Sequence, residues 1–387
     1  MNITLGSLEF GLTGGTQTYL LTVAEQLERL GHEATIYAES LGEMAELAER
    51  RGIRLAGPGR DRLPESDALL TRDAVMATAL GRRNPATPLV FVAASEVFDF
   101  QQPPQLPGAV SVVVALDDRV ADRMRALAVE AEVVRLRHPV DNERFRPRAP
   151  LHPSPRRILL LSNYLNGDRR ALFEAAASQA GVDVMLAGQD GQTALDPSRA
   201  ISQADIVVAK GRSVLEGMAC GRPTYIYDIA GCDGWVTPER YPLLEADGFA
   251  GRAEPTACDA GRILRDLAAY RPEMGQANRD LVMANHLASR HAQELVRLFR
   301  ARSSTRPAPH DALREVERLA RVQARAELQA RGLSRELEAV RRQARAARAD
   351  ADALRRTRRY RIGSTLATPG DRLRALRRRR RARRIGR

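Results

Sequence analysis

Residues 2–38, NITLGSLEFGLTGGTQTYLLTVAEQLERLGHEATIYA, hold the pattern that decides the fold. An apolar run at 3–8 is followed by a glycine-rich turn, and 16–30 then carries apolar side chains at helical spacing. A second short apolar run follows at 34–38. A strand, a helix and a strand in this order are the βαβ unit of a parallel sheet.

The same alternation continues on both sides of a proline-rich segment. Residues 146–157, RPRAPLHPSPRR, cannot continue a helix or a strand and predict a stiff connector. Before the connector we expect further strands at 68–70, 89–93, 110–116 and 132–136. After it we expect strands at 157–161, 182–187, 206–209 and 224–227, with helices at 168–180, 198–203 and 213–220.

We therefore predict an α/β protein with two doubly wound, Rossmann-like domains that face a cleft. Their ranges are 1–147 and 156–285, and a cross-over helix is expected at 286–301. Ligands of such sheets bind at the carboxyl ends of the strands, so the cleft is the expected site.

The net charge of +13 belongs to the C-terminal segment alone. Residues 302–387 hold 27 Arg and 9 acidic residues, a balance of +18, whereas 1–301 holds 34 basic and 39 acidic residues, a balance of −5. Only the segment from 302 on therefore calls for an acidic partner. The rest offers neither a basic stripe nor many aromatic residues, so we do not expect nucleic acid as a partner.

The localisation expected from composition is cytoplasmic. No apolar run reaches the roughly 18 residues that a membrane-spanning helix needs, and residues 1–10 lack the segments of a signal peptide. The three cysteines are scattered without a C-x-x-C pair, which argues against disulfides and zinc.

The C-terminal segment divides into a helical part and a basic tail. Apolar residues between 312 and 354 alternate at spacings of four and three, which is typical of a coiled-coil seam over 311–355. A homodimer through this seam and a single long helix with Glu–Arg pairs are both open at this stage. Arginine blocks in 356–387 predict peripheral attachment to an anionic membrane surface.

Two glycine turns carry the candidate chemistry. The first, Gly11–Thr16, suits a close approach of backbone to phosphate, although a simple turn capped by Thr16 explains the same residues. In the second, Gly211 and Ser213 open a short helix that can meet a diphosphate. Glu216 is then placed to accept hydrogen bonds from ribose hydroxyls, but Ser213-x-x-Glu216 is also a capping box.

Three segments together resemble the family-4-type glycosyltransferases of the GT-B fold. They are GGTQTYLLTVAEQLERLGHEATIYA at 14–38, HPVDNERFRPR at 138–148 and SVLEGMACGRPTYIYD at 213–228. The resemblance implies transfer of a sugar from a nucleotide-sugar donor, with retention of configuration and without a metal or other cofactor. The implied acceptor is a glycan or a lipid-linked molecule of envelope polysaccharide biosynthesis.

The resemblance also implies roles for individual residues. Glu216 corresponds to the glutamate that holds the donor ribose, and Lys210 or Arg212 supplies positive charge to the departing diphosphate. The backbone that approaches the phosphates is formed by Gly14, Gly15, Gly211, Ser213 and Val214.

Several positions depart from the family pattern. The family often has two glutamates eight positions apart, but the position seven before Glu216 is Ala209. The Arg and Lys of the first βα unit after the connector are missing, and Asn163, Arg169 and Arg170 are candidate substitutes. The expected histidine of the N-terminal domain is also missing, and Glu96 is the nearest polar residue.

Further candidate contacts to the sugar or acceptor are Thr16, Asp233 and Trp235. The last two lie in a glycine-containing segment, 231–239, that is also explained as a surface turn. The missing residues motivate an alternative function, a non-catalytic scaffold that binds a sugar nucleotide and recruits partners of envelope polysaccharide assembly through 311–355.

Overall fold

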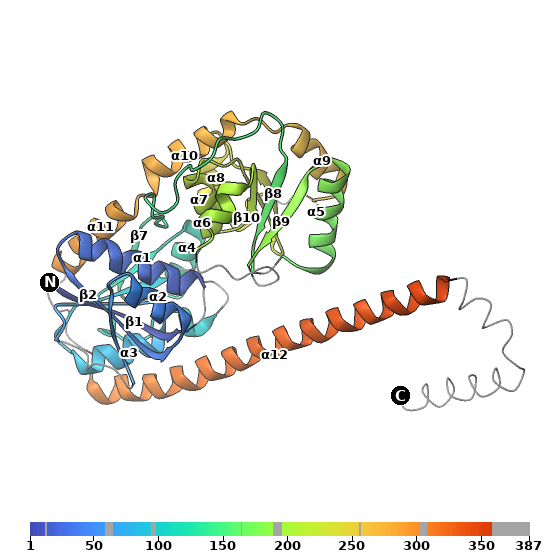
Figure 1. Ribbon diagram of the computed structural model, residues 1–387. Helices are drawn as coiled ribbons and strands as arrows, with labels where there is room; N and C mark the ends of the chain where they lie inside the picture. Colours follow the sequence, from blue (N-terminus) through green and yellow to red (C-terminus); the bar gives the residue numbers. More distant parts are fainter. Residues whose placement is uncertain are drawn as a thin grey trace, which may run out of the picture. The chain divides into compact units, whose positions relative to one another are not determined.

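The computed structural model describes residues 1–11, 14–58, 65–93, 98–163, 165–188, 196–254, 257–301 and 308–357. Residues 1–327 form one compact unit with two lobes, and the chain from 328 on belongs to a second unit. Figure 1 shows the elements of the first unit in sequence colours.

The N-lobe is a parallel sheet of seven strands in the order β3-β2-β1-β4-β5-β6-β7. The strands are β1 (Asn2–Phe10), β2 (Glu33–Leu41), β3 (Arg54–Ala56), β4 (Ala68–Thr71), β5 (Leu89–Ala93), β6 (Val112–Ala115) and β7 (Glu132–Arg135). The helices are α1 (Gly15–Arg29), α2 (Glu43–Arg50), α3 (Ala74–Arg83) and α4 (Asp118–Ala126), with a 3₁₀ turn η1 (Asp99–Gln101). The central strands are buried along their length, which explains their near-continuous apolar sequences.

The C-lobe is a five-stranded sheet in the order β12-β11-β10-β8-β9. Its strands are β8 (Arg157–Leu161), β9 (Asp183–Ala187), β10 (Ile206–Ala209), β11 (Thr224–Asp228) and β12 (Gly231–Trp235). Its helices are α5 (Gly167–Gln179), α6 (Ser198–Gln203), α7 (Arg212–Ala219), α8 (Tyr241–Ala246), α9 (Ala260–Ala268) and α10 (Glu273–Asn285). The two sheets confirm the α/β class with two doubly wound domains.

One edge of the C-lobe differs from the sequence expectation. The segment 231–239 was expected to be a loop, but its first part is strand β12, which pairs antiparallel with β11 and includes a register shift at Ile226/Tyr227. Antiparallel pairing places the Trp235 side chain in the lobe's interior, at 7% exposure.

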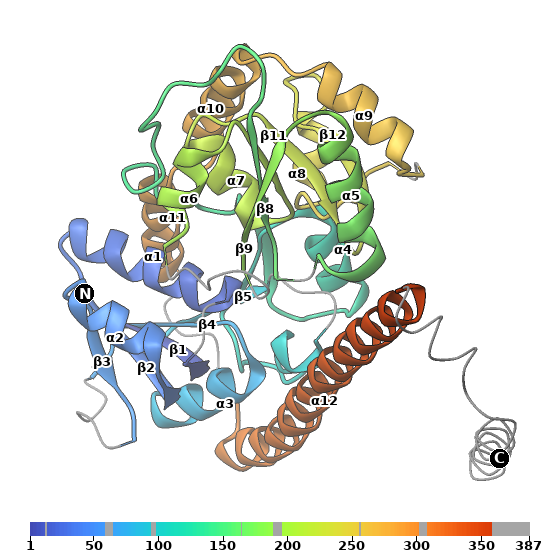
Figure 2. The same ribbon diagram turned by 45° about the vertical axis from the view of Figure 1, so that its right-hand side comes forward.

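The chain returns from the C-lobe to the N-lobe through a broken helix. After α10 the backbone makes one bridge between Val140 and Leu287, and helix α11 (Ala288–Ala301) then packs against α1. Figure 2 shows α11 beside α1. Leu295 and Phe299 of α11 are buried in the N-lobe core. The lobes are thus connected by two stretches of chain.

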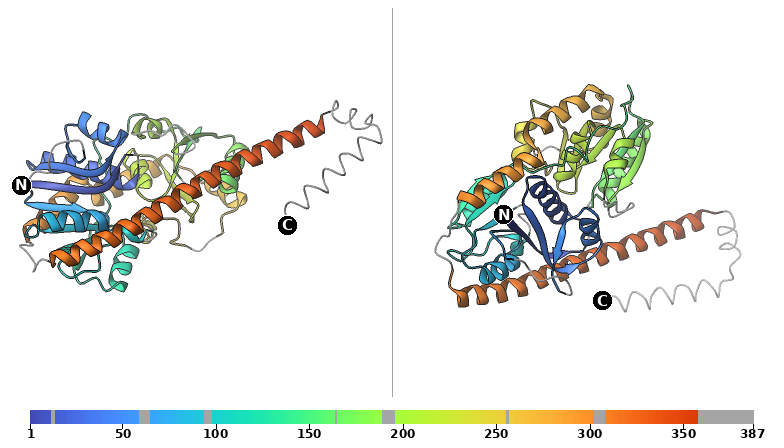
Figure 3. Two further views of the ribbon diagram at one scale, coloured as in Figure 1. Left: turned by 90° about the horizontal axis from the view of Figure 1, so that it is seen from below. Right: turned by 60° about the vertical axis from the view of Figure 1, so that its left-hand side comes forward.

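The last helix, α12 (His310–Arg356), begins on the N-lobe, next to α3 (Figures 1 and 3). Leu313, Ala320 and Ala324 are buried there, and Arg82 of α3 pairs with Glu317 at 3.1 Å. Arg321 forms two hydrogen bonds with Glu39 at 2.6 and 2.7 Å.

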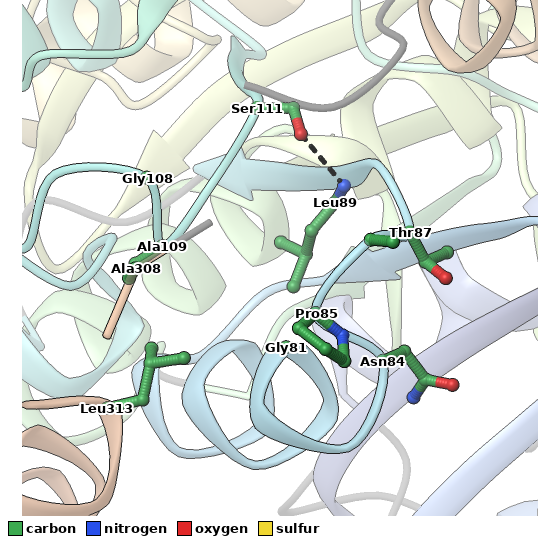
Figure 4. Close-up of a pocket in the computed structure, with 11 residues that line it drawn as sticks. Gly81, Asn84, Pro85, Thr87, Leu89, Gly108, Ala109, Ser111, Ala308 and Leu313 are labelled. Carbon is green, nitrogen blue, oxygen red and sulfur yellow. Dashed lines mark hydrogen bonds between the residues drawn. The ribbon is translucent and has the colours of Figure 1, made fainter. Parts of the chain in front are cut away.

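The small pocket in Figure 4 lies at the same place, between Ala308, Leu313 and the turn that precedes β5.

The buried face of α12 is not the apolar seam expected from the sequence. Leu319, a seam residue, is 52% exposed although it lies between buried neighbours of the docked face. Beyond residue 327 the seam residues Leu333, Leu337, Val340 and Leu354 are exposed by 50–66%. The helix itself exists, and whether a second copy covers the seam stays a prediction. The basic tail from 358 on lies outside the described residues.

No helix in the described parts of the chain combines the length and the hydropathy of a membrane-spanning segment.

Candidate functional site between the two lobes

Helix α1 begins without a side-chain cap. Its N-cap residue is Gly14, in extended conformation, and the expected cap from Thr16 is not formed. Thr16, partly exposed, lies in the first turn. A Cβ atom added to Gly15 would meet no described atom within 4 Å. The start of α1 is therefore open, and its positive end is available to an anion.

Helix α7 begins in the same way in the C-lobe. Its N-cap residue is Gly211, with φ of +58°, a left-handed conformation that favours glycine. Ser213 lies inside the helix rather than at the N-cap, so the capping box with Glu216 is not formed. Space above Gly211 is open to 4 Å among the described atoms, and Val214 is buried beneath it.

Glu216 pairs with Arg212 instead. The Arg212 Nε donates to Glu216 Oε1 at 2.9 Å, and the two side chains are only 9% and 8% exposed. Burial raises the pKa of Glu216, while the charge of Arg212 and its hydrogen bond act in the opposite direction. Arg212 Nη2 also donates to Thr22 Oγ1 of α1 at 2.8 Å, which joins the two lobes.

A second buried arginine, Arg72, follows strand β4 directly. Its guanidinium lies 4.6 Å from the centre of the Tyr19 ring, and Nη1 donates weakly to Gly15 O at 3.4 Å. Burial, with a smaller contribution from the charge of Arg212, lowers the pKa of Arg72 to about 10. Arg72 Nε and Arg212 Nη1 are buried and have no hydrogen-bond partner within the described part of the chain.

Two histidines complete the cluster around Tyr19. Tyr19 Oη bonds His291 Nε2 at 2.8 Å, and His138 approaches the Tyr19 ring edge-on at 6.0 Å. Burial lowers the pKa of His291 to about 3 and holds the pKa of His138 well below its usual value, with Arg212 and Arg72 adding to the latter shift. Both rings are therefore neutral at pH 7, and the cluster's charge comes from its arginines and Glu216.

The sequence did not predict Arg72, His138 or His291 as members of this site. The one usable signal was at Arg72, because a polar residue directly after a buried parallel strand lies at the ligand-binding edge of the sheet.

Two predicted contact residues are held in the interior of the C-lobe. The Asp233 carboxylate accepts hydrogen bonds from the backbone N–H of Ala253 and Glu254. Trp235 donates from Nε1 to Asp266 O at 2.9 Å and packs edge-on against Tyr225. In this structure both side chains stabilise the lobe, and neither is presented to the cleft.

The remaining predicted residues lie at strand ends, on α5 or outside the described parts. Lys210 is half-buried directly after β10, and Asn163 is exposed after β8. Arg169 donates to the backbone O of Asp228, and Arg170 pairs with Glu174 along α5. Glu96 lies outside the described residues. The described residues contain no cluster of His, Cys, Asp or Glu that is suited to a metal ion.

Ion pairs hold the lobes in this arrangement. Glu25 of α1 accepts two hydrogen bonds from Arg144, which precedes the connector, at 2.8 and 2.9 Å. Arg119 of α4 in the N-lobe pairs with Asp247 after α8 in the C-lobe at 2.6 Å. The lobes are therefore held together by charged contacts as well as by the two covalent connections.

This protein is similar to known proteins in its fold but not in its sequence. The sequence matches no family model and no curated protein at a significant level.

Solved structures are nevertheless similar in fold, at low sequence identity. Anabaena HepE, solved with UDP and glucose, has 13% identity and a TM-score of 0.57 over 78% of this chain and 100% of its own. A glycosyltransferase from Rickettsia africae has 15% identity and a TM-score of 0.52 over 78% and 98%. Staphylococcus aureus TarM has 10% and 0.53 over 77% and 99%. The chain has the two-lobed GT-B fold of these glycosyltransferases.

Proposed function

We propose that the protein is a glycosyltransferase that moves a sugar from a nucleotide-sugar donor to a glycan or lipid-linked acceptor. The observation that carries the proposal is an uncapped helix start in each lobe, together with two buried arginines, Arg72 and Arg212, that each have an N–H group without a partner among the described residues. The similar HepE structure contains UDP and glucose, and the TarM structure contains UDP, which supports a nucleotide-sugar donor here.

In the proposed reaction the nucleoside diphosphate is the leaving group. The open starts of α1 and α7 stabilise its negative charge, and Arg212 adds a guanidinium that is already oriented by Glu216 and Thr22. Helix ends and arginine together supply the positive charge that a metal would otherwise provide. Retention of configuration and independence of metals are part of the proposal.

Glu216 is proposed to hold the donor ribose. Because its Oε1 is bonded to Arg212, the ribose hydroxyls would share this carboxylate with the guanidinium. The other proposed contacts along the diphosphate are Lys210, Asn163, Gly14, Gly15, Gly211, Ser213 and Val214. Thr16 and Glu96 remain proposed contacts to the sugar or acceptor.

The experiment is a screen of UDP-, GDP-, ADP- and dTDP-sugars with the full-length protein, read as nucleotide release and as binding heat. We expect one donor class to bind and to be hydrolysed slowly without acceptor. Glu216→Ala should weaken donor binding by at least tenfold, whereas Glu174→Gln, which breaks an equivalent Arg–Glu pair on α5, should not. No donor binding, or equal binding by both variants, contradicts the proposal.

The alternative is a non-catalytic scaffold that binds a sugar nucleotide. Its supporting observation is that Glu216 is already engaged by Arg212 and that the buried strand before it ends in Ala209, without a second carboxylate. A scaffold would bind a donor with no turnover under any acceptor or salt condition. Measured release of nucleotide from any donor rules it out.

We propose two further contacts for the C-terminal segment. The exposed seam of Leu333, Leu337 and Val340 suits a homodimer, which sedimentation velocity tests by comparison with Leu337→Asp. The basic tail suits an anionic membrane surface at the inner face of the cytoplasmic membrane. Its test is sedimentation with vesicles that contain 30% phosphatidylglycerol, against vesicles of phosphatidylcholine alone.

A further inference from the structure

Arg72 is a buried cation that has no carboxylate partner within the described residues. It is 7% exposed, and its contacts are the Tyr19 ring, a long hydrogen bond to Gly15 O and the repulsive charge of Arg212. A buried charge is normally paired and hydrogen-bonded, because its transfer from water is costly. Among the described residues, this position therefore lacks a negative group.

Arg212, in the C-lobe, also has a buried N–H group without an acceptor among the described residues. Glu216 satisfies its Nε and Thr22 its Nη2, but Nη1 is buried without a partner in the described chain. Arg72 Nε is likewise unsatisfied. An arginine N–H that is buried without an acceptor costs free energy, which a bound anion would recover.

The surroundings of the two arginines favour an anion as the missing partner. Burial, with the charges of Arg212 and Arg72 adding to its effect, holds the pKa of His138 well below its usual value, so this ring adds no third positive charge. The open space at Gly15 and at Gly211 lies at the starts of α1 and α7, where the helix dipoles are positive. Arg72 contacts Gly15 and Tyr19, and Arg212 contacts Thr22, so both unsatisfied donors belong to side chains that lie along the first two turns of α1.

We propose that Arg72 and Arg212 form one anion site across the two lobes, with Arg72 as its N-lobe half. The ligand group is a set of anionic oxygens, either the diphosphate of the donor or a carboxylate on the transferred sugar. The second source would make the protein selective for uronic acid donors. The site itself stands on the arginine geometry, and only the identity of its source rests on the proposed function.

The test uses the full-length protein and the variant Arg72→Gln, with Arg83→Gln as the matched control. Arg83 lies in the same lobe with its guanidinium 5.7 Å over the Tyr37 ring, so its replacement removes the same charge and a comparable stacking contact. The probes are inorganic pyrophosphate, UDP, GDP, UDP-glucose and UDP-glucuronate. Titrations are made in 0.3 M NaCl, which screens exposed arginines more than buried ones.

We expect Arg72→Gln to bind pyrophosphate at least tenfold more weakly than wild type and Arg83→Gln to bind it unchanged. A tenfold loss corresponds to about 1.4 kcal/mol, close to the lower limit for one hydrogen bond to a charged group. If Arg72→Gln weakens the binding of UDP or GDP by the same factor as the binding of pyrophosphate, the source is the diphosphate. If Arg72→Gln weakens the binding of UDP-glucuronate alone, and the binding of UDP-glucose and pyrophosphate is unchanged, the source is the sugar carboxylate. In that case the loss of UDP-glucuronate binding is the result that supports the site.

A merely structural Arg72 gives a different result. In that case Arg72→Gln lowers the melting temperature but binds every probe as wild type does, and the proposal is overturned. Arg72→Lys provides a second measurement if the Gln variant does not fold. It keeps the charge but loses the planar guanidinium, and we expect intermediate affinity.

Nucleotide-sugar turnover tests the proposed function and not the anion site. If wild type binds pyrophosphate through Arg72 but releases no nucleotide from any donor, the anion site stands and the proposed function fails. If wild type binds none of the five probes, the anion site is overturned as well.

Discussion

Replacing Arg212 should destabilise the C-lobe far more than replacing an exposed arginine, because it leaves Glu216 buried without its partner. The pair is 2.9 Å apart and both side chains are less than a tenth exposed. Arg170 and Glu174 on α5 have the same i,i+4 arrangement at 2.8 Å but are 26% and 37% exposed. The two pairs differ mainly in burial, which makes the second a matched control.

The magnitude follows from that difference. Removal of one partner of a buried ion pair typically costs about 3–5 kcal/mol, and Arg212→Met also loses the hydrogen bond to Thr22. We expect a loss of about 3 kcal/mol in the free energy of unfolding for Arg212→Met. The double variant Arg212→Met/Glu216→Gln should recover about 2 kcal/mol of it, because no buried charge is then left alone. The Arg170–Glu174 cycle should give a coupling of only about 0.3–0.5 kcal/mol.

Urea unfolding followed by tryptophan fluorescence measures these values. Trp235 is the only tryptophan of the chain and is 7% exposed in the C-lobe core, so its emission reports this lobe. Each single variant and each double variant is measured at pH 7. Equal coupling in the two cycles, or strict additivity for Arg212 and Glu216, would refute the reasoning.

The stability of Arg212→Met should also depend on pH. Burial raises the pKa of Glu216, and without Arg212 the opposing effect is gone. Between the unfolded and the folded pKa the native state binds more protons than the unfolded state, so stability falls as pH rises through this window. Arg212→Met should therefore regain stability between pH 7 and pH 5, and the double variant should not show this gain.

Three other predictions concern different parts of the chain. Burial lowers the pKa of His291 to about 3, so the contribution of this residue to stability is present above pH 6.5 and is lost as pH falls toward 3. The melting temperature of His291→Gln should therefore fall less steeply at acid pH than that of wild type. Arg321→Ala should loosen the first turns of α12, by about 1 kcal/mol for a partly buried network, and hydrogen exchange there should increase while exchange in the C-lobe stays unchanged. Gly275→Ala places a Cβ against the backbone O of Gly221, so we expect a loss of about 1–3 kcal/mol in urea unfolding; a neutral result would mean that α10 shifts freely.

Local sequence patterns were sufficient for most of the fold. Apolar runs and glycine turns are properties of short segments, and they predicted the parallel strands of both lobes except the short edge strand β3. Strand β12 was missed because Gly231 and Gly234 read as turn residues, whereas its strand conformation depends on pairing with β11. The docked face of α12 was missed for a related reason, since Leu313 and Ala320 are buried by a partner surface distant in sequence.

The site was predictable only where its residues are neighbours in the chain. Arg212 and Glu216 lie on one helical turn, and their importance could be inferred from the segment itself. The cluster at Tyr19 instead brings together Arg72 from the end of β4, His138 from the segment after β7 and His291 from α11. Nothing local marks these residues as partners, because the return of the chain after α10 brings them together.

That return has a consequence for synthesis of the protein on the ribosome. The N-lobe is made first, yet Leu295 and Phe299 of α11 are part of its core and pack with the apolar residues of α1. Until residue 301 has emerged, the lobe cannot bury that surface, however complete its own sheet is. The first lobe to be translated is therefore the last to be finished, and a fragment that stops at the connector would expose an apolar face prone to aggregation.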